Sequence, residues 1–537
     1  MAVSAGNRFD AIVLGGSIEG LVAAAYLGKA GLRVVVVEGR EVLGGTAETT
    51  ERVPGFKFDT CLDSAGYLSP RVVRELDLTR HGLEYAPSDG PTVVPNLNGP
   101  PMVLHSDPAA TRDGLRAVSA GDAERWPEFC HQMLRFAGLL GRVYEGPAPL
   151  PTAAGRSNMV TLLKLGLRTR ALGRTGMLEF LRTGPMAVAD LLDDWFEDDL
   201  LKGALGATAV RHLGQGPRSA GTAFTFLHNL VGGRSVPRPR GVVRGGMGHL
   251  AFALELAGKG WGVEYRTGIG DGAGTAGGLE QIMIVDEAVA GVALGTGAEI
   301  TAPLVISAHD ARRTFGDLVD PVQLDPEFLW TVNNIRFRGV AAKINLALSR
   351  LPDFAGAPDL SGRIIMCQGL DDLERAYDAT KYGRVSELPV LEMTIPSLAD
   401  PGLAPPGQHV LSIWLQYAPV HLRAGTWDAA ARESLGDLAE EVLARYAPGV
   451  RETVVGREVL APPDLEARYG LSGGHLYQGE LALDQILFMR PVPGWAHYRT
   501  PVAGLYLCGP ATHPGGGITG QSGLLAARAV TEEGVDS

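Results

Sequence analysis

Residues 10–46 read DAIVLGGSIEGLVAAAYLGKAGLRVVVVEGREVLGGT and alternate between apolar runs and glycine-rich turns. The apolar run at 9–14 is short and lacks polar alternation, which predicts a buried parallel strand. Residues 21–28 place apolar side chains at helical spacing, and Gly31 stands where a helix C-cap is expected. A second apolar run at 32–37 predicts another buried strand, and Glu38 follows it directly. This order is typical of a βαβ unit that binds a dinucleotide.

The turn Gly15-Gly16-Ser17-Ile18-Glu19-Gly20 is the predicted pyrophosphate site. Backbone N–H groups and the positive end of a helix dipole bind a pyrophosphate when no side chain stands in the way. Gly15 is expected to form the tight turn and Gly20 to let the helix pack closely on the strand. Ser17 takes the place of the middle glycine of G-x-G-x-x-G. Glu38, with Gly39 and Arg40 beside it, is predicted to contact the ribose.

A second glycine pair, Gly44-Gly45, follows soon after and is expected to approach the phosphates as well. The extended pattern resembles the N-terminal FAD signature of the amine oxidase and phytoene desaturase flavoproteins, which implies FAD as the cofactor. Those families usually have Arg after the glycine pair, where this chain has Thr46.

The whole chain has 537 residues, a net charge of -12 and four cysteines, Cys61, Cys130, Cys367 and Cys508. The acidic balance argues against a nucleic-acid partner. The cysteines have no C-x-x-C spacing, so neither a metal site nor a redox disulfide is predicted, and a reducing, cytoplasmic setting fits. A signal peptide is not expected because the first strand begins by Phe9, and no apolar run is long enough to predict a membrane span.

The C-terminal end predicts a second cofactor-facing turn. Residues 504–509 (GLYLCG) indicate a strand that runs into Gly509, residues 510–517 (PATHPGGG) a tight loop, and residues 518–530 a helix. A helix dipole there would stabilise a reduced flavin anion. The predicted contacts are Gly509, Pro510, Gly516, Gly517, Ile518 and Thr519.

This C-terminal motif, the upstream segment 483–501, and PGFKFD at 54–59 followed by LSP and HGL together resemble one flavoprotein group. It is the group named for pyridine nucleotide-disulfide oxidoreductase domain-containing protein 2, a branch of the phytoene desaturase-like flavoproteins. The resemblance implies an α/β fold of the glutathione reductase and amine oxidase type, in which a Rossmann-type FAD-binding domain interleaves with an α+β substrate domain. We expect the FAD-binding domain at 1–90, 236–312 and 481–537, and the substrate domain at 91–235 and 313–480.

The middle of the chain predicts helices at 120–143, 158–173, 176–183 and 185–198, and strands of a mixed sheet at 339–349, 409–417 and 453–460. Residues 156–182 interleave basic and leucine side chains. Such a stretch lies on a membrane surface or rings the entrance for an apolar substrate, or it is a solvated helix face over the core.

Three residues are candidates for catalysis. Asp63 falls where the resembled family usually has a small residue, so its carboxylate could hold a cationic or hydroxylated substrate, although an exposed loop aspartate is the plainer interpretation. His513 and Gln521 flank the predicted isoalloxazine loop, and an imidazole titrates in a range that suits proton transfer. His309 is interpreted as a loop histidine. No family base carries over to the segment at 473–479, because His475 and Gln478 stand where the family often has Asn and His.

The resulting hypothesis is an FAD-dependent oxidoreductase that desaturates or oxidises a largely apolar small metabolite. Hydride would pass to flavin N5, and O2 or a quinone would reoxidise the flavin. Three alternatives stay open: a redox-neutral flavin-dependent isomerase, an amine oxidase with Trp495 or Tyr498 facing the flavin, and an interaction protein that keeps FAD as a structural ligand. Substrate, acceptor, oligomeric state and covalent attachment of FAD do not follow from the sequence.

Overall fold

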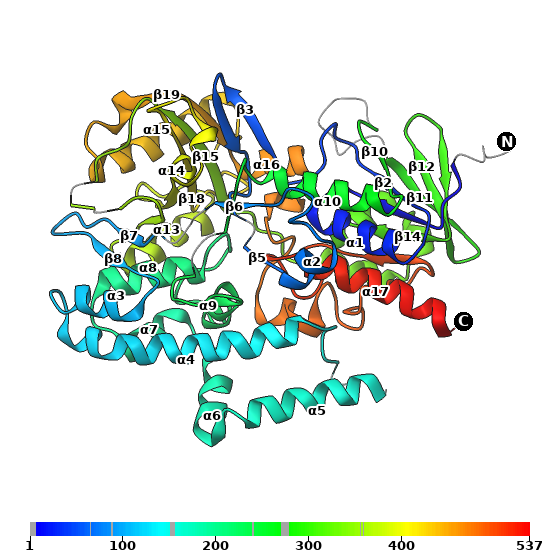
Figure 1. The fold of residues 1–537 in the computed structure, drawn as a ribbon, viewed down its shortest axis with the longest axis horizontal. Coiled ribbons are helices and arrows are strands. Elements are labelled where there is room, and N and C mark those ends of the chain that lie inside the picture. The colour runs from blue at the N-terminus through cyan, green and yellow to red at the C-terminus, as the bar shows by residue number, and fades with distance from the viewer. Residues whose placement is uncertain are drawn as a thin grey trace.

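The computed structural model describes residues 7–64, 66–86, 90–150, 156–238, 241–269, 279–354, 356–357 and 359–536. Two sheets organise the chain, each with helices packed on it (Figure 1). Segments from both ends of the chain meet in the first sheet, and the middle of the chain builds the second.

The first sheet is wholly parallel and has the strand order β10-β2-β1-β14-β20. Its strands are β1 (Ala11–Leu14), β2 (Val34–Val37), β10 (Glu264–Arg266), β14 (Leu304–Ser307) and β20 (Leu505–Leu507). β1 and β2 are buried at every position, as expected for a parallel sheet that is covered on both faces.

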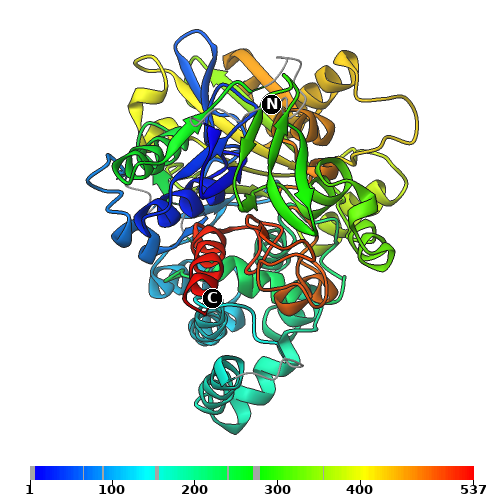
Figure 2. The same cartoon turned by 90° about the vertical axis from the view of Figure 1, so that its right-hand side faces the viewer.

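Each face of this sheet has its own cover. Ala11 and Val13 pack with α1 (Ile18–Lys29), α10 (Gly248–Gly260) and α17 (Gln521–Asp536). Ile12 and Leu14 pack with the antiparallel sheet of β11 (Leu279–Val285), β12 (Ala288–Leu294) and β13 (Glu299–Thr301). Figure 2 shows these antiparallel strands, in green, on the side turned toward the viewer, with α17 in red below them.

The second sheet is mixed, with the order β19-β15-β18-β17-β16-β7-β8, and only the pair β16 and β7 is parallel. Its strands are β7 (Thr92–Val94), β8 (Met102–Leu104), β15 (Ala341–Leu348), β16 (Arg363–Met366), β17 (Val390–Thr394), β18 (His409–Gln416) and β19 (Val454–Leu460). Helix α15 (Ala429–Tyr446) covers one face, and a layer of helices covers the other. The helical segments between β8 and β16 are α3 (Pro108–Leu115), α4 (Ala120–Tyr144), α5 (Arg156–Arg170), α6 (Gly173–Thr183), α7 (Val188–Trp195), α8 (Asp199–Ala209), α9 (Thr222–Leu230), α11 (Ala311–Arg313) and α12 (Pro326–Asn333).

Short elements connect the two halves. They are the pairs β3 (Thr49–Val53) with β4 (Phe56–Asp59), β5 (Tyr67–Leu68) with β21 (Ile518–Thr519), and β6 (Tyr85–Ala86) with β9 (Val242–Val243), and the helices α2 (Pro70–Glu75), α13 (Leu370–Lys381), α14 (Pro396–Ala399) and α16 (Pro462–Tyr469).

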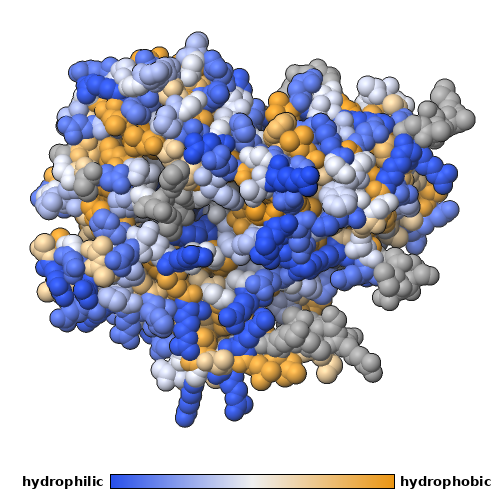
Figure 3. Space-filling view, in the orientation of Figure 1, coloured by the Kyte–Doolittle hydropathy of each residue, from blue (hydrophilic) through white to orange (hydrophobic). Residues whose placement is uncertain are grey.

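Helices α5 and α6 project from the body of the molecule (Figure 1). Their exposed apolar side chains form part of the orange surface at the lower edge of Figure 3 and include Met159, Leu163, Leu167, Leu178 and Leu181. Within the described residues, no helix combines the length and apolar character needed to cross a bilayer. Peripheral membrane contact through 156–182 stays a prediction, which co-sedimentation with anionic vesicles would test.

The predicted fold class and the mixed second sheet are confirmed. The prediction of a helix over 518–530 is wrong at its start, because Ile518 and Thr519 pair with β5 and the helix begins at Gln521. The domain boundaries stay a prediction.

Candidate functional site

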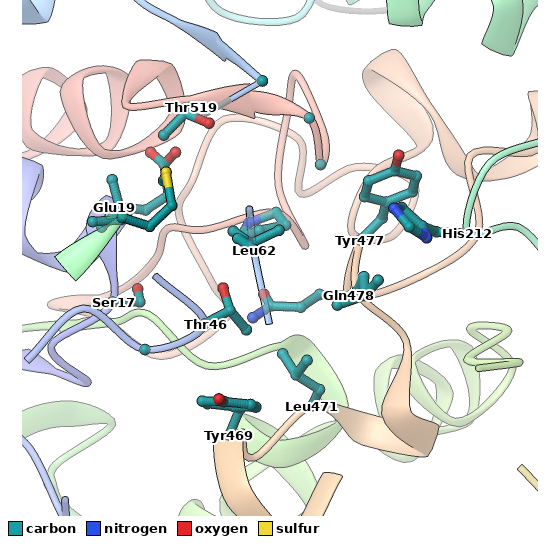
Figure 4. Close-up of a pocket in the computed structure, with 18 of the residues that line it drawn as sticks. Ser17, Glu19, Thr46, Leu62, His212, Tyr469, Leu471, Tyr477, Gln478 and Thr519 are labelled. Carbon is teal, nitrogen blue, oxygen red and sulfur yellow. The ribbon is translucent and has the colours of Figure 1, made fainter. Parts of the chain in front are cut away.

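A cavity of about 1410 Å³ lies where the two sheets meet. Residues from both predicted turns line it, together with side chains from the second sheet and its helices. In the close-up of Figure 4, Ser17, Glu19 and Thr46 lie on one side and His212 and Tyr477 on the other, with Leu62 between them. The cavity therefore runs from the first glycine turn into the part of the chain that was predicted to bind substrate.

The first turn has the geometry that its glycines predict. Gly15 adopts a φ of +93°, which favours glycine, and a Cβ on Gly20 would lie 2.3 Å from the carbonyl oxygen of Gly15. Ser17 is the N-cap of α1, because its Oγ accepts a hydrogen bond from the Gly20 N–H at 3.4 Å. The serine in place of the middle glycine thus has a structural role.

Glu38 stands at the end of β2 and faces the cavity. Its Oε2 accepts a hydrogen bond from the Gly16 N–H at 2.7 Å, and its Oε1 accepts one from the Arg40 N–H at 2.9 Å. Arg40 in turn donates to the Gly45 carbonyl at 3.0 Å. This network fixes a carboxylate at the position where a ribose would bind.

Glu19 joins the two ends of the chain. Its carboxylate accepts hydrogen bonds from the N–H groups of Gly520 at 2.5 Å and Gly523 at 2.7 Å, at the start of α17. Burial raises the pKa of Glu19 to about 7. The expectation that the start of α17 serves only a bound flavin is therefore wrong, because Glu19 already takes two of these N–H groups.

The C-terminal loop is held from behind by a buried pair. His228 Nε2 lies 2.7 Å from the Gly516 carbonyl oxygen, and its Nδ1 lies 2.7 Å from the Tyr144 hydroxyl. The loop residues that line the cavity are Pro510, Gly516, Gly517, Ile518 and Thr519.

His212 and Gln478 line the far part of the cavity, and both are non-glycine residues with positive φ, 60° and 50°. Such backbone conformations are costly and concentrate at functional sites. The ring of His212 is buried against Trp414, with 4.5 Å between the ring centroids. Its Nδ1 has no hydrogen-bond partner among the described residues, and burial holds its pKa well below the usual range.

The comparisons with known proteins agree with this geometry. A rat protein, pyridine nucleotide-disulfide oxidoreductase domain-containing protein 2 (Rattus norvegicus), is 33% identical over 97% of this chain and 93% of its own length. The chain belongs to this protein family. The model of an NAD(P)-binding Rossmann-like domain matches residues 13–65.

More distant relatives are enzymes by name. A limonene dehydrogenase polypeptide of Castellaniella defragrans is 26% identical over 98% of this chain and 95% of its own, and the neurosporene-forming phytoene desaturase of Cereibacter sphaeroides is 25% identical over 96% and 92%. The predicted oxidoreductase of the phytoene desaturase-like class is confirmed.

Solved structures share the fold. An oxidoreductase from Methanosarcina mazei has a TM-score of 0.61 at 18% identity, covering 97% of this chain and all of its own. A putrescine oxidase structure has a TM-score of 0.59 at 15% identity and covers 99% of both chains.

The structure brings most of the predicted cofactor residues to the cavity, although whether they contact a cofactor stays a prediction. Those that line it are Gly15, Ser17, Ile18, Glu19, Glu38, Arg40, Gly45, Thr46, Pro510, Gly516, Gly517, Ile518 and Thr519. The others lie behind this wall: Gly16, Gly20, Gly39, Gly44 and Gly509. The N–H of Gly509 donates to Ser522 Oγ at 2.7 Å.

The predicted catalytic residues have other surroundings than expected. Asp63 lines the cavity, but its Oδ2 accepts hydrogen bonds from buried Lys343 at 3.1 Å and from Ser412 at 3.0 Å. It is therefore half of an ion pair, neither an exposed loop aspartate nor a lone carboxylate. His513 is fully buried outside the cavity wall, where burial lowers its pKa to about 3, and Gln521 accepts a hydrogen bond from Ser69 Oγ at 2.9 Å. Neither residue reaches the space where a substrate would lie.

The aromatic residues suggested for an amine oxidase do not line the cavity. Tyr498 is buried and donates to the His513 carbonyl at 3.0 Å, and Trp495 packs on Phe328. Other aromatic residues, which the sequence did not single out, line the cavity: Trp414, Tyr469 and Tyr477.

Three further residues that line the cavity were not predicted from the sequence: Arg211, His212 and Arg238. They come from segments between helices that carry no motif. The only signal was indirect, since arginine and histidine within largely apolar helical stretches need a partner or a cavity.

Proposed function

We propose that the cavity holds FAD and that the protein uses it to oxidise or desaturate a small, largely apolar metabolite. One observation carries this proposal: a single cavity is lined by the glycine turn of the first βαβ unit and by the loop at 516–519, with an apolar wall beyond them. Two turns from opposite ends of the chain suit a ligand with a dinucleotide at one end and a reactive ring at the other.

The donor set fits FAD. Glu38 would accept the hydroxyls of the adenosine ribose, and the start of α1 at Ser17 and Ile18 would bind the pyrophosphate through backbone N–H groups. Gly45, Thr46 and the loop at 516–519 would surround the ring system. When bound, FAD supplies a hydride acceptor at N5, and O2 or a quinone takes the electrons afterwards.

Oxidation of a C–H bond releases a proton as well as a hydride, so the chain must provide a proton acceptor. His212 suits this role because its ring is neutral at neutral pH and its Nδ1 has no partner among the described residues. Leu62, Leu471 and Leu476 line the same region and would exclude water from the reacting atoms.

Two further candidates are weaker. An amine oxidase would bind a cationic amine, whereas Arg211 and Arg238 line the cavity beside Tyr477. A redox-neutral isomerase has the same cofactor requirement, and the experiment below separates it from an oxidase.

The test is anaerobic mixing of the purified protein with a panel of terpenes and terpenoid acids, followed by absorption spectroscopy. We expect oxidised flavin to be bleached by a substrate, the product to be two hydrogens lighter, and the colour to return with air or a quinone. His212→Gln should retain its flavin and bleach at least about tenfold more slowly. Product of unchanged mass without bleaching would establish the isomerase, and a colourless protein would exclude both enzymes.

A further inference from the structure

Four arginines line the cavity, and three of them form ion pairs. Arg40 pairs with Glu48, and Arg468 pairs with Glu48 and Glu458. Arg211 donates from Nε to Glu392 Oε2 at 2.9 Å. These pairs hold the three guanidinium groups against the protein wall.

Arg238, on the segment between α9 and β9, is different. Its Nη1 donates to the Val231 carbonyl at 2.7 Å, and no carboxylate lies within ion-pair distance among the described residues. Burial lowers its pKa to about 10, so the side chain stays charged at neutral pH. A half-buried cation without an acid is costly, which indicates that a ligand supplies the missing negative charge.

The surroundings of Arg238 fit an anionic ligand. Arg238 also lines a smaller neighbouring cavity of about 400 Å³ together with Arg363, and Arg363 shares Glu392 with Arg211. Tyr477 lies among these guanidinium groups, which act to lower its pKa, although burial outweighs them. The phenol therefore stays protonated and can donate a hydrogen bond to an oxyanion.

We propose that the substrate carries a carboxylate or phosphate group, which binds to Arg238 with Arg211 and Tyr477 beside it. This inference rests on the proposed function and narrows the substrate from a largely apolar metabolite to an apolar acid. The apolar body would lie along Trp414 and Leu476, and the oxyanion would occupy the arginine end of the cavity. A guanidinium binds an oxyanion through paired charge-assisted hydrogen bonds, which are strongest away from bulk water.

The experiment uses four probes that share one apolar body: geranate, geranyl phosphate, geraniol and geranylamine. Each is titrated into the holoenzyme by calorimetry, with the flavin absorption recorded in the same samples. The variant is Arg238→Met, and the matched control is Arg234→Met, which removes an exposed arginine from the same segment.

We expect geranate or geranyl phosphate to bind at least about tenfold more tightly than geraniol, and geranylamine to bind most weakly. Arg238→Met should lose this preference and leave the affinity for geraniol unchanged, whereas Arg234→Met should behave like the wild type. The comparison of the two acids identifies which oxyanion the subsite prefers.

Equal affinity for acids and alcohol, a preference that survives in Arg238→Met, or no binding of any probe would overturn the proposal. Failure of the proposed function would appear differently. Samples without flavin absorption would refute the FAD enzyme, while calorimetry would still report whether Arg238 selects acids.

Discussion

His228 contacts the C-terminal loop and the helix layer through its two ring nitrogens. Because the Gly516 carbonyl can only accept, Nε2 must carry the proton, and Nδ1 therefore accepts from the Tyr144 hydroxyl. Burial lowers the pKa of His228 to about 4, with Arg238 and Arg490 acting in the same direction. Burial also raises the pKa of Tyr144, so the phenol keeps its proton. The loop at 516–519 is thus fixed by a neutral imidazole.

This arrangement predicts acid sensitivity. Below pH 6.5 the unfolded chain takes up a proton on His228 and the native protein does not, so the free energy of unfolding falls as the pH drops toward about 4. The loss amounts to about 3 kcal/mol over this range. His228→Gln keeps a donor and an acceptor but cannot titrate, so its thermal midpoint should fall less than that of the wild type between pH 7 and pH 4.5.

Differential scanning fluorimetry at the two pH values measures the difference, with His421→Gln, at an exposed histidine, as the control. Identical pH responses of wild type and His228→Gln would refute this role of the neutral ring.

At the scale of elements, the packing of α1 on α17 joins the two ends of the chain. The helices lie side by side on one face of the parallel sheet (Figure 1), and Glu19 binds the first N–H groups of α17. Gly523 permits this contact, because a Cβ at its position would lie 2.2 Å from the Glu19 carbonyl oxygen.

We expect Gly523→Ala to push the two helices apart and to destabilise the protein by about 1–3 kcal/mol. Flavin should also be lost more readily on dialysis, because both turns move with their helices. Gly138→Ala is the matched control, since a Cβ on this glycine of α4 meets no atom within 4 Å. A thermal midpoint for Gly523→Ala at or above the wild-type value would contradict the packing described here.

The sequence predicts those elements whose signal is local. The first βαβ unit, the antiparallel sheet at 279–301 and the long helix α4 have clear periodicity or turns, and the structure has them at nearly the predicted bounds. The start of α17 was misjudged because Ile518 and Thr519 are apolar enough for a helix, and only the distant β5 makes them a strand.

The candidate site was predictable only at its two glycine turns. Lys343 pairs with Asp63 across 280 positions, and its place in a buried strand gives no hint of that partner. Arg211, Arg238 and Trp414 reach the cavity through the packing of the second sheet on the helix layer. Such contacts depend on tertiary structure, which no local pattern encodes.

At the scale of the whole molecule, the proposed function depends on one flavin bound between turns from opposite ends of the chain. The most direct test is the binding isotherm of FAD to the apoprotein, measured by quenching of flavin fluorescence. Three variants isolate the effect: Gly15→Val at the first turn, Gly517→Val at the last, and Gly297→Val in a β-turn with open space around it. All three glycines have φ between +78° and +93°, so the backbone strain of substitution is matched.

We predict one FAD per chain for the wild type and Gly297→Val. Gly15→Val and Gly517→Val should each bind FAD at least about a hundredfold more weakly while keeping their circular dichroism spectra, a loss that corresponds to about 3 kcal/mol. Wild-type protein that takes up no FAD, or full affinity in either cavity variant, would contradict a flavin held between the two turns.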